Sequence, residues 1–106
     1  MKPAVTGRWK ITQMDTWDLE FLDMVEPAHI TFEKGGRGSL HFGALDADLE
    51  WRLNPGLERV DFTFQGFDEG DDVEGTGCAK TEGKLMTGRI LFHLGERSGF
   101  KARKGR

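Results

Sequence analysis

The chain has 106 residues, 37% apolar and 31% charged, with a formal net charge of −3. This length suits one domain, and so mild a charge excludes the dense basic surface of most nucleic-acid-binding proteins. The chain contains no apolar run of signal-peptide or membrane-spanning length. We therefore expect a single cytoplasmic domain over residues 1–106, with no nucleic-acid or membrane partner and a flexible basic tail at 103–106.

Alternating apolar and polar residues predict a series of short β-strands that end at glycine-rich turns. The first strand covers residues 7–13, with Trp9 and Ile11 facing inward. From Asp15 to Val25 the alternation stops, and apolar residues recur at helical spacing. This segment predicts one short helix that Asp15 caps, with Trp17, Phe21 and Met24 on its apolar face.

The strand pattern resumes at residues 28–33, and a turn at Gly35-Gly36 leads to a strand over residues 38–42. The next turn falls at Gly43-Ala44 or at Asp46-Ala47, because either two-residue loop preserves the inward parity. The fourth strand follows this turn, and a further turn covers Asn54-Pro55-Gly56. The residues expected to face inward here are Ile30, Phe32, Leu40, Phe42, Leu49, Trp51 and Leu53.

Two further hairpins follow from their turn residues. A two-residue turn at Glu69-Gly70 predicts the pairs Phe64–Gly75, Phe62–Gly77 and Val60–Ala79, so that large residues face small ones. A turn at Glu82-Gly83 predicts the pairs Ala79–Met86 and Gly77–Gly88. Farther along, the expected inward residues are Ile90, Phe92, Leu94, Phe100 and Ala102.

These elements amount to about eight consecutive strands. Closure of the last strand onto the first would remove both exposed sheet edges. The sequence therefore predicts an all-β fold: an up-and-down antiparallel barrel of about eight strands, with one short helix between the first and second strands.

Gly7-Arg8-Trp9 on the opening strand of such a barrel, followed by a helix, resembles the calycin group, which includes lipocalins and avidins. The resemblance implies that Trp9 plugs one end of the barrel and that a basic residue of the last strand covers its ring. Arg103 matches this basic residue, with Lys101 or Lys104 as substitutes. The chain lacks the polar ring by which avidins hold biotin, so neither transport nor biotin binding is carried over.

The chain also resembles small bacterial β-barrel proteins of uncharacterised function. The likeness lies in the Trp- and Asp-containing helix, in the acidic hairpin at 68–74 and in the segment from His93 to Phe100. It supports the fold and implies no chemistry.

The predicted interior contains Gly75, Gly77, Ala79 and Gly88, which leave local space. Two interpretations follow: neighbouring aromatic rings fill this space, or a small apolar or aromatic ligand enters at the helix end of the barrel. The second gives the best functional hypothesis, a non-enzymatic binding protein. Its expected ligand-binding residues are Trp17, Phe21, Trp51, Phe62 and Met86.

Other constellations favour no chemistry. Ser98, His93 and Glu96 crowd one loop without a readable oxyanion hole, so we expect the Ser98 hydroxyl or the Glu96 carboxylate to bond free amides of the last turn. The carboxylates at 68–74 lack the order of a calcium loop and predict a solvated hairpin tip.

His29, His41 and His93 have outward parity, with no shared carboxylate. A three-residue turn at Gly35-Gly36 would place His41 across from Thr31. We therefore predict no enzyme activity, metal or cofactor.

A second class of function uses the outer face of the barrel. Leu85 and Leu91 have outward parity on one strand and would leave apolar surface exposed. The alternative hypothesis is therefore a protein-interaction or oligomerising module with a filled core, such as a homodimer. The single cysteine, Cys78, excludes an internal disulfide in either case.

Overall fold

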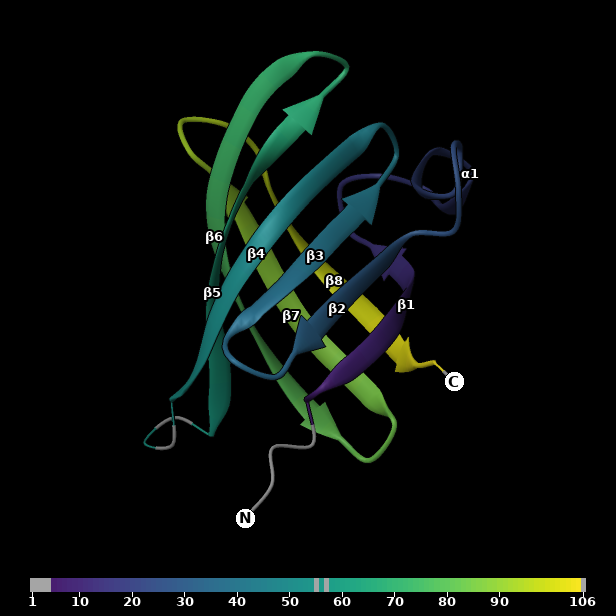
Figure 1. The fold of residues 1–106 in the computed structure, drawn as a ribbon. Coiled ribbons are helices and arrows are strands. Elements are labelled where there is room, and N and C mark those ends of the chain that lie inside the picture. The colour runs from purple at the N-terminus through teal and green to yellow at the C-terminus, as the bar shows by residue number, and fades with distance from the viewer. Residues whose placement is uncertain (1–4, 55, 57, 106) are drawn as a thin grey trace.

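A computed structural model describes residues 5–54, 56 and 58–105, and it is a closed barrel of eight antiparallel strands (Figure 1). Each strand pairs with its neighbours in the chain, and β8 pairs with β1. The predicted fold class is therefore confirmed. The elements are β1 (Gly7–Met14), α1 (Leu19–Leu22), β2 (His29–Glu33), β3 (Arg37–Phe42), β4 (Leu45–Asn54), β5 (Arg59–Asp68), β6 (Asp71–Glu82), β7 (Leu85–Phe92) and β8 (Arg97–Lys104).

Most residues with inward parity are buried, because successive side chains of a strand alternate between the two faces of the barrel wall. Leu53 is an exception at 48% exposure, since β4 pairs with β3 only as far as Glu50 and its last residues project beyond the barrel. Leu94 is 96% exposed because β7 ends at Phe92. Leu53 keeps its inward parity opposite buried Val60 but lies beyond the end of the barrel, whereas the prediction that Leu94 continues the inward face of β7 is wrong.

Two of the predicted turns lie where their residue types place them. The β3–β4 turn is Gly43-Ala44, since Phe42 pairs with Leu45, and the alternative at Asp46-Ala47 is excluded. The β5–β6 turn is Glu69-Gly70, both with positive φ, and all predicted pairs of this hairpin are present. Pro55, in the turn predicted at 54–56, lies outside the described residues.

The β6–β7 turn differs from its prediction by one position. Glu82 pairs with Leu85, so the two loop residues are Gly83 and Lys84. Gly83 has φ +64° and takes the first loop position, where a type II′ turn requires glycine. Gly77 consequently pairs with Ile90 instead of Gly88, and the strand register is shifted by two residues with its inward parity intact.

Helix α1 is much shorter than predicted. Asp18, not Asp15, is its N-cap, and the Asp18 carboxylate accepts a hydrogen bond from the Phe21 amide at 3.0 Å. After the helix, Asp23 accepts bonds from the Ala28 amide and from Lys10 Nζ, both at 2.9 Å. These two bonds tie the β1–β2 loop to β1.

The two ends of the barrel differ. The α1 end carries α1 with the β3–β4, β5–β6 and β7–β8 turns, and the Trp9 end carries the β2–β3 and β6–β7 turns (Figure 1). At the Trp9 end, the buried Trp9 indole donates to the Val5 carbonyl at 2.8 Å. Lys104 Nζ lies 4.9 Å from the centre of the Trp9 ring.

The basic residue over the Trp9 ring is therefore Lys104, one of the two expected substitutes, rather than Arg103. Ala102 faces inward, so alternation turns Arg103 outward into an exposed position and Lys104 back over the ring. Strand β8 includes both residues, so half of the predicted flexible tail is strand; Arg106 lies outside the described residues.

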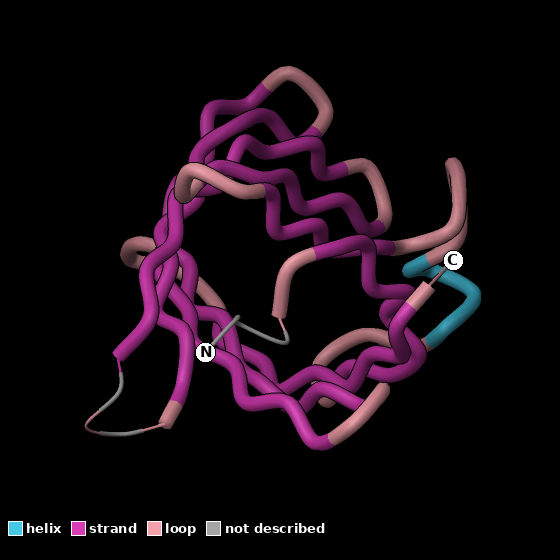
Figure 2. Tube along the Cα trace, turned by 60° about the horizontal axis from the view of Figure 1, so that its bottom comes forward, coloured by secondary structure: helices cyan, strands magenta, loops and turns pink. Residues whose placement is uncertain are grey.

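The closed strands surround one interior (Figure 2). The core within it includes the buried rings of Trp9, Phe32, Phe42, Phe62, Phe64 and Phe100. A Cβ built on Gly77 would lie 2.4 Å from Phe62 Cζ, and one on Gly75 would lie 2.6 Å from Phe64 Cζ. Phe100 takes the corresponding place beside Gly88. The space at the glycines is therefore occupied by protein, as the filling interpretation predicts.

Candidate functional site

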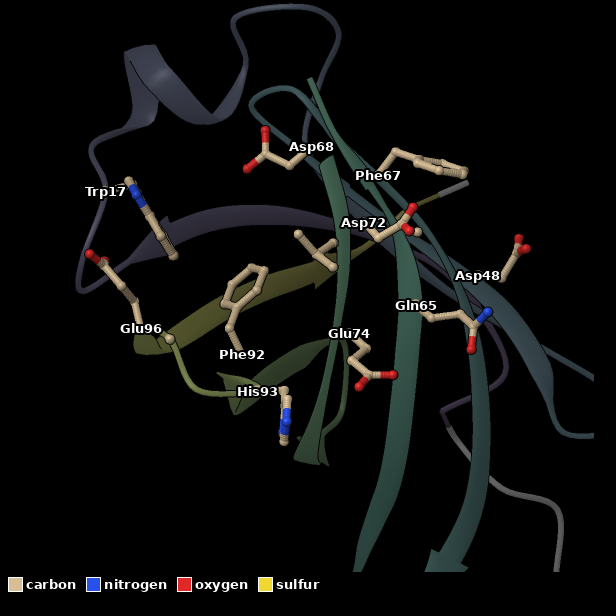
Figure 3. Close-up of a pocket in the computed structure, with 13 residues that line it drawn as sticks. Trp17, Asp48, Gln65, Phe67, Asp68, Asp72, Glu74, Phe92, His93 and Glu96 are labelled. Atoms are coloured by element: carbon tan, nitrogen blue, oxygen red, sulfur yellow. The ribbon is translucent and has the colours of Figure 1, made fainter. Parts of the chain in front are cut away.

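A pocket of about 850 Å³ opens at the α1 end, outside the filled interior (Figure 3). It exists because β6 begins at Asp71 but pairs with β7 only from Gly75, so the β5–β6 hairpin projects beyond β7. The pocket lies between this projection and the β7–β8 turn. Its lining residues are Trp17, Asp48, Gln65, Gly66, Phe67, Asp68, Asp72, Val73, Glu74, Phe92, His93, Gly95 and Glu96.

One wall of the pocket is aromatic. The Trp17 and Phe92 rings meet edge to face at a centroid distance of 6.2 Å, and both are half-buried. Beneath them, the buried Phe42 ring lies 5.1 Å from Trp17 and 6.4 Å from Phe92. Each wall residue therefore packs on the core and leaves part of its ring accessible.

Ser98 positions the segment that carries Trp17. Its buried hydroxyl accepts hydrogen bonds from the amides of Asp15, at 3.0 Å, and Thr16, at 3.1 Å, and it donates to the Gly99 carbonyl. The Thr16 hydroxyl donates to the Arg97 carbonyl at 2.7 Å. Ser98 thus satisfies free amides, as predicted, but those of the β1–β2 loop instead of the last turn.

Carboxylates line the outer part of the pocket. Figure 3 shows Asp72, Glu74 and Asp48 on the far side of the β6 strand from Trp17 and Phe92, because alternation turns Val73 toward the core and its two neighbours outward. No Lys or Arg is among the described lining residues, and none of the carboxylates forms an ion pair with a described Lys or Arg. The acidic lining residues are Asp48, Asp68, Asp72, Glu74 and Glu96.

Only part of the predicted ligand site comes together. Trp17 lines the pocket, and Phe21 supports it from behind at a centroid distance of 6.3 Å. Trp51 lies toward the other end, where its indole donates to the carbonyls of Glu33 and Arg37 beside the β2–β3 turn. Inward parity shows which face of the sheet a side chain occupies, but not how far along the barrel axis it lies. Trp17 and Trp51 lie toward opposite ends of the barrel, so the structure does not bring them together in one site.

The remaining two predicted ligand-binding residues belong to the core. Phe62 is buried and packs edge to face on Phe32 at 5.8 Å. Met86 is buried near the Trp9 end, where it pairs with Ala102. Neither lines the α1-end pocket, whereas Phe62 and its cross-strand partner Trp51 both line a second hollow of about 720 Å³.

The pocket residues Phe92, Val73 and Asp72 were missed because of the register of β6 and β7. A turn at Glu82-Gly83 would have paired Val73 with Phe92 and left no projecting hairpin. The observed pair is Gly75 with Phe92, so the β6 residues before Gly75 have no partner in β7, and those at 72–74 line the pocket. The position of Gly83 in the turn is the sequence signal that could have revealed it.

The histidine prediction also needs correction. His41 has outward parity but its side chain is only 3% exposed, because it lies against the β1–β2 loop residue Glu26 and stacks on His29 at 5.6 Å. His41 pairs with His29 across the strands rather than with Thr31. The loop between β2 and β3 has three residues, 34–36, and this length sets that register.

His41 shares carboxylates that the sequence did not place near it. Its Nδ1 lies 2.8 Å from Asp46 Oδ1 and 3.7 Å from Glu26 Oε2, and the three ligand atoms fall within 4.8 Å of one another. Among the described residues, this group has the donor types that could hold a metal ion. Both carboxylates are well exposed and His41 Nε2 is buried without a partner, so the second shell usual for a ligating histidine is missing.

Burial lowers the pKa of the neighbouring His29, an effect that its contact with the Pro27 carbonyl opposes and the nearby Arg8 guanidinium reinforces. The neutral form of His29 is therefore favoured beside His41.

Comparisons with protein-family models, curated proteins and solved structures found no match to this chain. Among the described residues, no helix has the length and apolar character needed to cross a bilayer.

Proposed function

We propose that this protein is a non-enzymatic binding protein that holds a small apolar or aromatic ligand in the α1-end pocket. One observation carries the proposal: half-buried Trp17 and Phe92 form the wall of a hollow of about 850 Å³, a size that suits a small molecule. Since rings fill the interior beside the glycines, the ligand binds at the mouth and not in the lumen.

The wall is suited to this role because it is anchored on its inner side. Phe42 and Phe64 pack against Phe92, and Phe42 also packs against Trp17, so both wall rings are held by core residues. A rigid aromatic wall loses little conformational entropy when it binds a flat apolar group, and burial of its exposed area favours the complex.

The resemblance to calycins supports the same proposal. Trp9 with Lys104 over its ring closes one end of the barrel, as that resemblance implies, and leaves the α1 end for binding. On this basis we propose that the chain is a calycin-like barrel protein. A cytoplasmic location is also part of the proposal, because Cys78 is the single cysteine and has no partner for an internal disulfide.

The three tryptophans permit a direct test of this proposal. Trp9 is buried and Trp51 lies toward the other end, so we expect a panel of aromatic lipophiles to change only the emission of Trp17. A Trp51→Phe variant should keep the fluorescence response, and a Trp17→Phe variant should lose most of it. No response from the native protein to any member, or a response that survives in Trp17→Phe and vanishes in Trp51→Phe, would refute the proposed site.

Self-association through the outer face of β7 is a second candidate, favoured by the exposure of Leu85 and Leu91 together with the filled interior. Thr87 and Arg89, also exposed, stand between the two leucines, so the surface is not one continuous apolar patch. Sedimentation that shows a strict monomer at all concentrations would remove this candidate.

A further inference from the structure

We propose that the outer surface of β7, β8 and β1, which we call the basic face, docks onto an anionic membrane surface. These three strands are neighbours in the closed barrel (Figure 1). The proposal is independent of the α1-end pocket. It replaces the expectation of no membrane partner, which rested on the absence of a membrane-spanning segment, because docking onto the surface of a bilayer requires none.

The three strands contain no aspartate or glutamate. Alternation turns most of their charged side chains outward, because apolar core residues occupy the inward positions. Lys10 is half-buried and pairs with Asp23 at 2.9 Å, but none of the exposed cations forms an ion pair with a described carboxylate. These exposed cations are Arg8, Arg89, Arg97, Lys101 and Arg103.

The opposite part of the barrel wall is acidic. Strand β4, which is farthest from β8 around the barrel, has Asp46, Asp48 and Glu50 at exposed positions and Arg52 as its only cation. The net charge of −3 averages the two sides, so it concealed the basic face. The shortest extent of the molecule is 21 Å, whereas salt screens charges beyond about 8 Å, so the acidic side does not oppose docking of the basic one.

Carboxylates border the basic face at the α1 end. A Cβ built on Gly99 would lie 2.7 Å from Asp15 Oδ2, so Asp15 covers the outer side of β8 there. Glu96 belongs to the β7–β8 turn at the same end. Both groups weaken the positive potential in this part of the face.

The positive charge is strongest toward the Trp9 end. Lys80 and Lys101 flank Thr87 from the two neighbouring strands. Lys84 is exposed in the β6–β7 turn, so these cations extend the face past the single carboxylate of Glu82. We therefore expect the Trp9 end of the face to make the main contact with an anionic surface.

Two exposed leucines of β7 indicate which anionic partner fits. Leu85 is 57% exposed and lies opposite Arg103, and Leu91 is 48% exposed and lies opposite Arg97. Each leucine thus has a guanidinium beside it. An anionic bilayer matches this pairing, because its phosphate groups lie directly above apolar acyl chains.

Other partners match the basic face less well. A nucleic-acid backbone offers phosphates but no apolar surface for the leucines, and β7, β8 and β1 have no aromatic ring at an outward position on which a base could stack. A twofold contact with a second copy would bring Arg89 and Arg97 of one copy toward the same residues of the other. Both considerations favour the membrane surface.

Co-sedimentation with lipid vesicles tests the proposal. We expect the protein to bind vesicles of phosphatidylcholine mixed with phosphatidylserine and not to bind vesicles of phosphatidylcholine alone. Added salt should release the protein, since the contact is largely electrostatic.

Paired variants assign the binding to the basic face. Lys101→Gln combined with Arg103→Gln should weaken binding to the anionic vesicles about 25-fold, or about fivefold for each cation near the surface. The matched control is Arg37→Gln combined with Arg52→Gln, which removes the same charge from exposed positions of β3 and β4 and should leave binding unchanged.

Leucine variants then separate lipid from nucleic acid. Leu85→Thr and Leu91→Thr should each weaken binding to the anionic vesicles about threefold, because less apolar area is buried. Tighter binding to a single-stranded oligonucleotide than to these vesicles would instead assign the face to nucleic acid. Self-association that the leucine variants abolish, without vesicle binding, would assign it to a second copy. Equal binding to both kinds of vesicle, no vesicle binding at low salt, or an equal loss in the control pair would also overturn the proposal.

Discussion

At the scale of single residues, alternation predicted the buried environment of Trp9. The family resemblance pointed to Arg103, with Lys101 or Lys104 as substitutes, whereas the parity of β8 turns Lys104 over the ring and Arg103 into solvent. Lys104 Nζ also donates to the Thr6 carbonyl, so it joins the end of β8 to the segment before β1. Parity alone, applied from Ala102 onward, would have identified the correct residue.

Replacement of these two basic residues should therefore have unequal effects. Lys104→Met should lower the free energy of unfolding by about 1 kcal/mol, since a cation–π contact and a hydrogen bond are lost. Arg103→Met should stay within about 0.5 kcal/mol of the native protein. Urea unfolding followed by fluorescence measures both, and a larger loss for Arg103→Met would contradict the assignment.

At the scale of elements, the residues of each turn determine the register of the two strands that it joins, and hence which side chains lie side by side. The Glu69-Gly70 turn was placed correctly and all its cross-strand pairs followed, whereas a one-position error at Gly83 shifted β7 by two residues and concealed the pocket. Helix α1 was overestimated because Asp18 begins it late and Asp23 ends it by bonding the loop beyond. Local hydrogen bonds of this kind depend on tertiary contacts that periodicity does not contain.

The β1–β2 loop should make stability sensitive to acid. Hydrogen bonds from the Ala28 amide and from Lys10 hold the pKa of Asp23 below its ordinary value of 3.8. A depressed pKa in the folded state contributes stability above the unfolded pKa, and this contribution is lost as the pH falls through the folded value. Melting temperatures should consequently drop below about pH 4.

An Asp23→Asn variant should melt lower than the native protein at neutral pH and show a smaller decrease on acidification. Glu20→Gln, an exposed carboxylate in α1, is the control and should follow the native curve. Parallel curves for Asp23→Asn and the native protein would show that Asp23 does not tie this loop to β1.

At the scale of the whole molecule, the eight-strand barrel could be predicted because alternation recurs in every strand and closure leaves no open edge. The filling of the interior was also foreseeable, since the hairpin of β5 and β6 set Phe62 and Phe64 opposite glycines. The height of each side chain along the barrel was not, because it depends on the register and stagger of all eight strands. For that reason the sequence grouped Trp17 with Trp51 and Met86.

The most direct measurement is an NMR map of intermolecular contacts with naphthylmethanol, an uncharged aromatic lipophile, using isotope-labelled protein. Nuclear Overhauser effects should connect the naphthyl protons to the Trp17 indole, the Phe92 ring and the Val73 methyl groups, and to none of the methyl groups of Met86 and Ile90. Contacts to Met86 and Ile90 would mean that the ligand enters the lumen, and they would contradict a filled barrel with its binding site at the mouth.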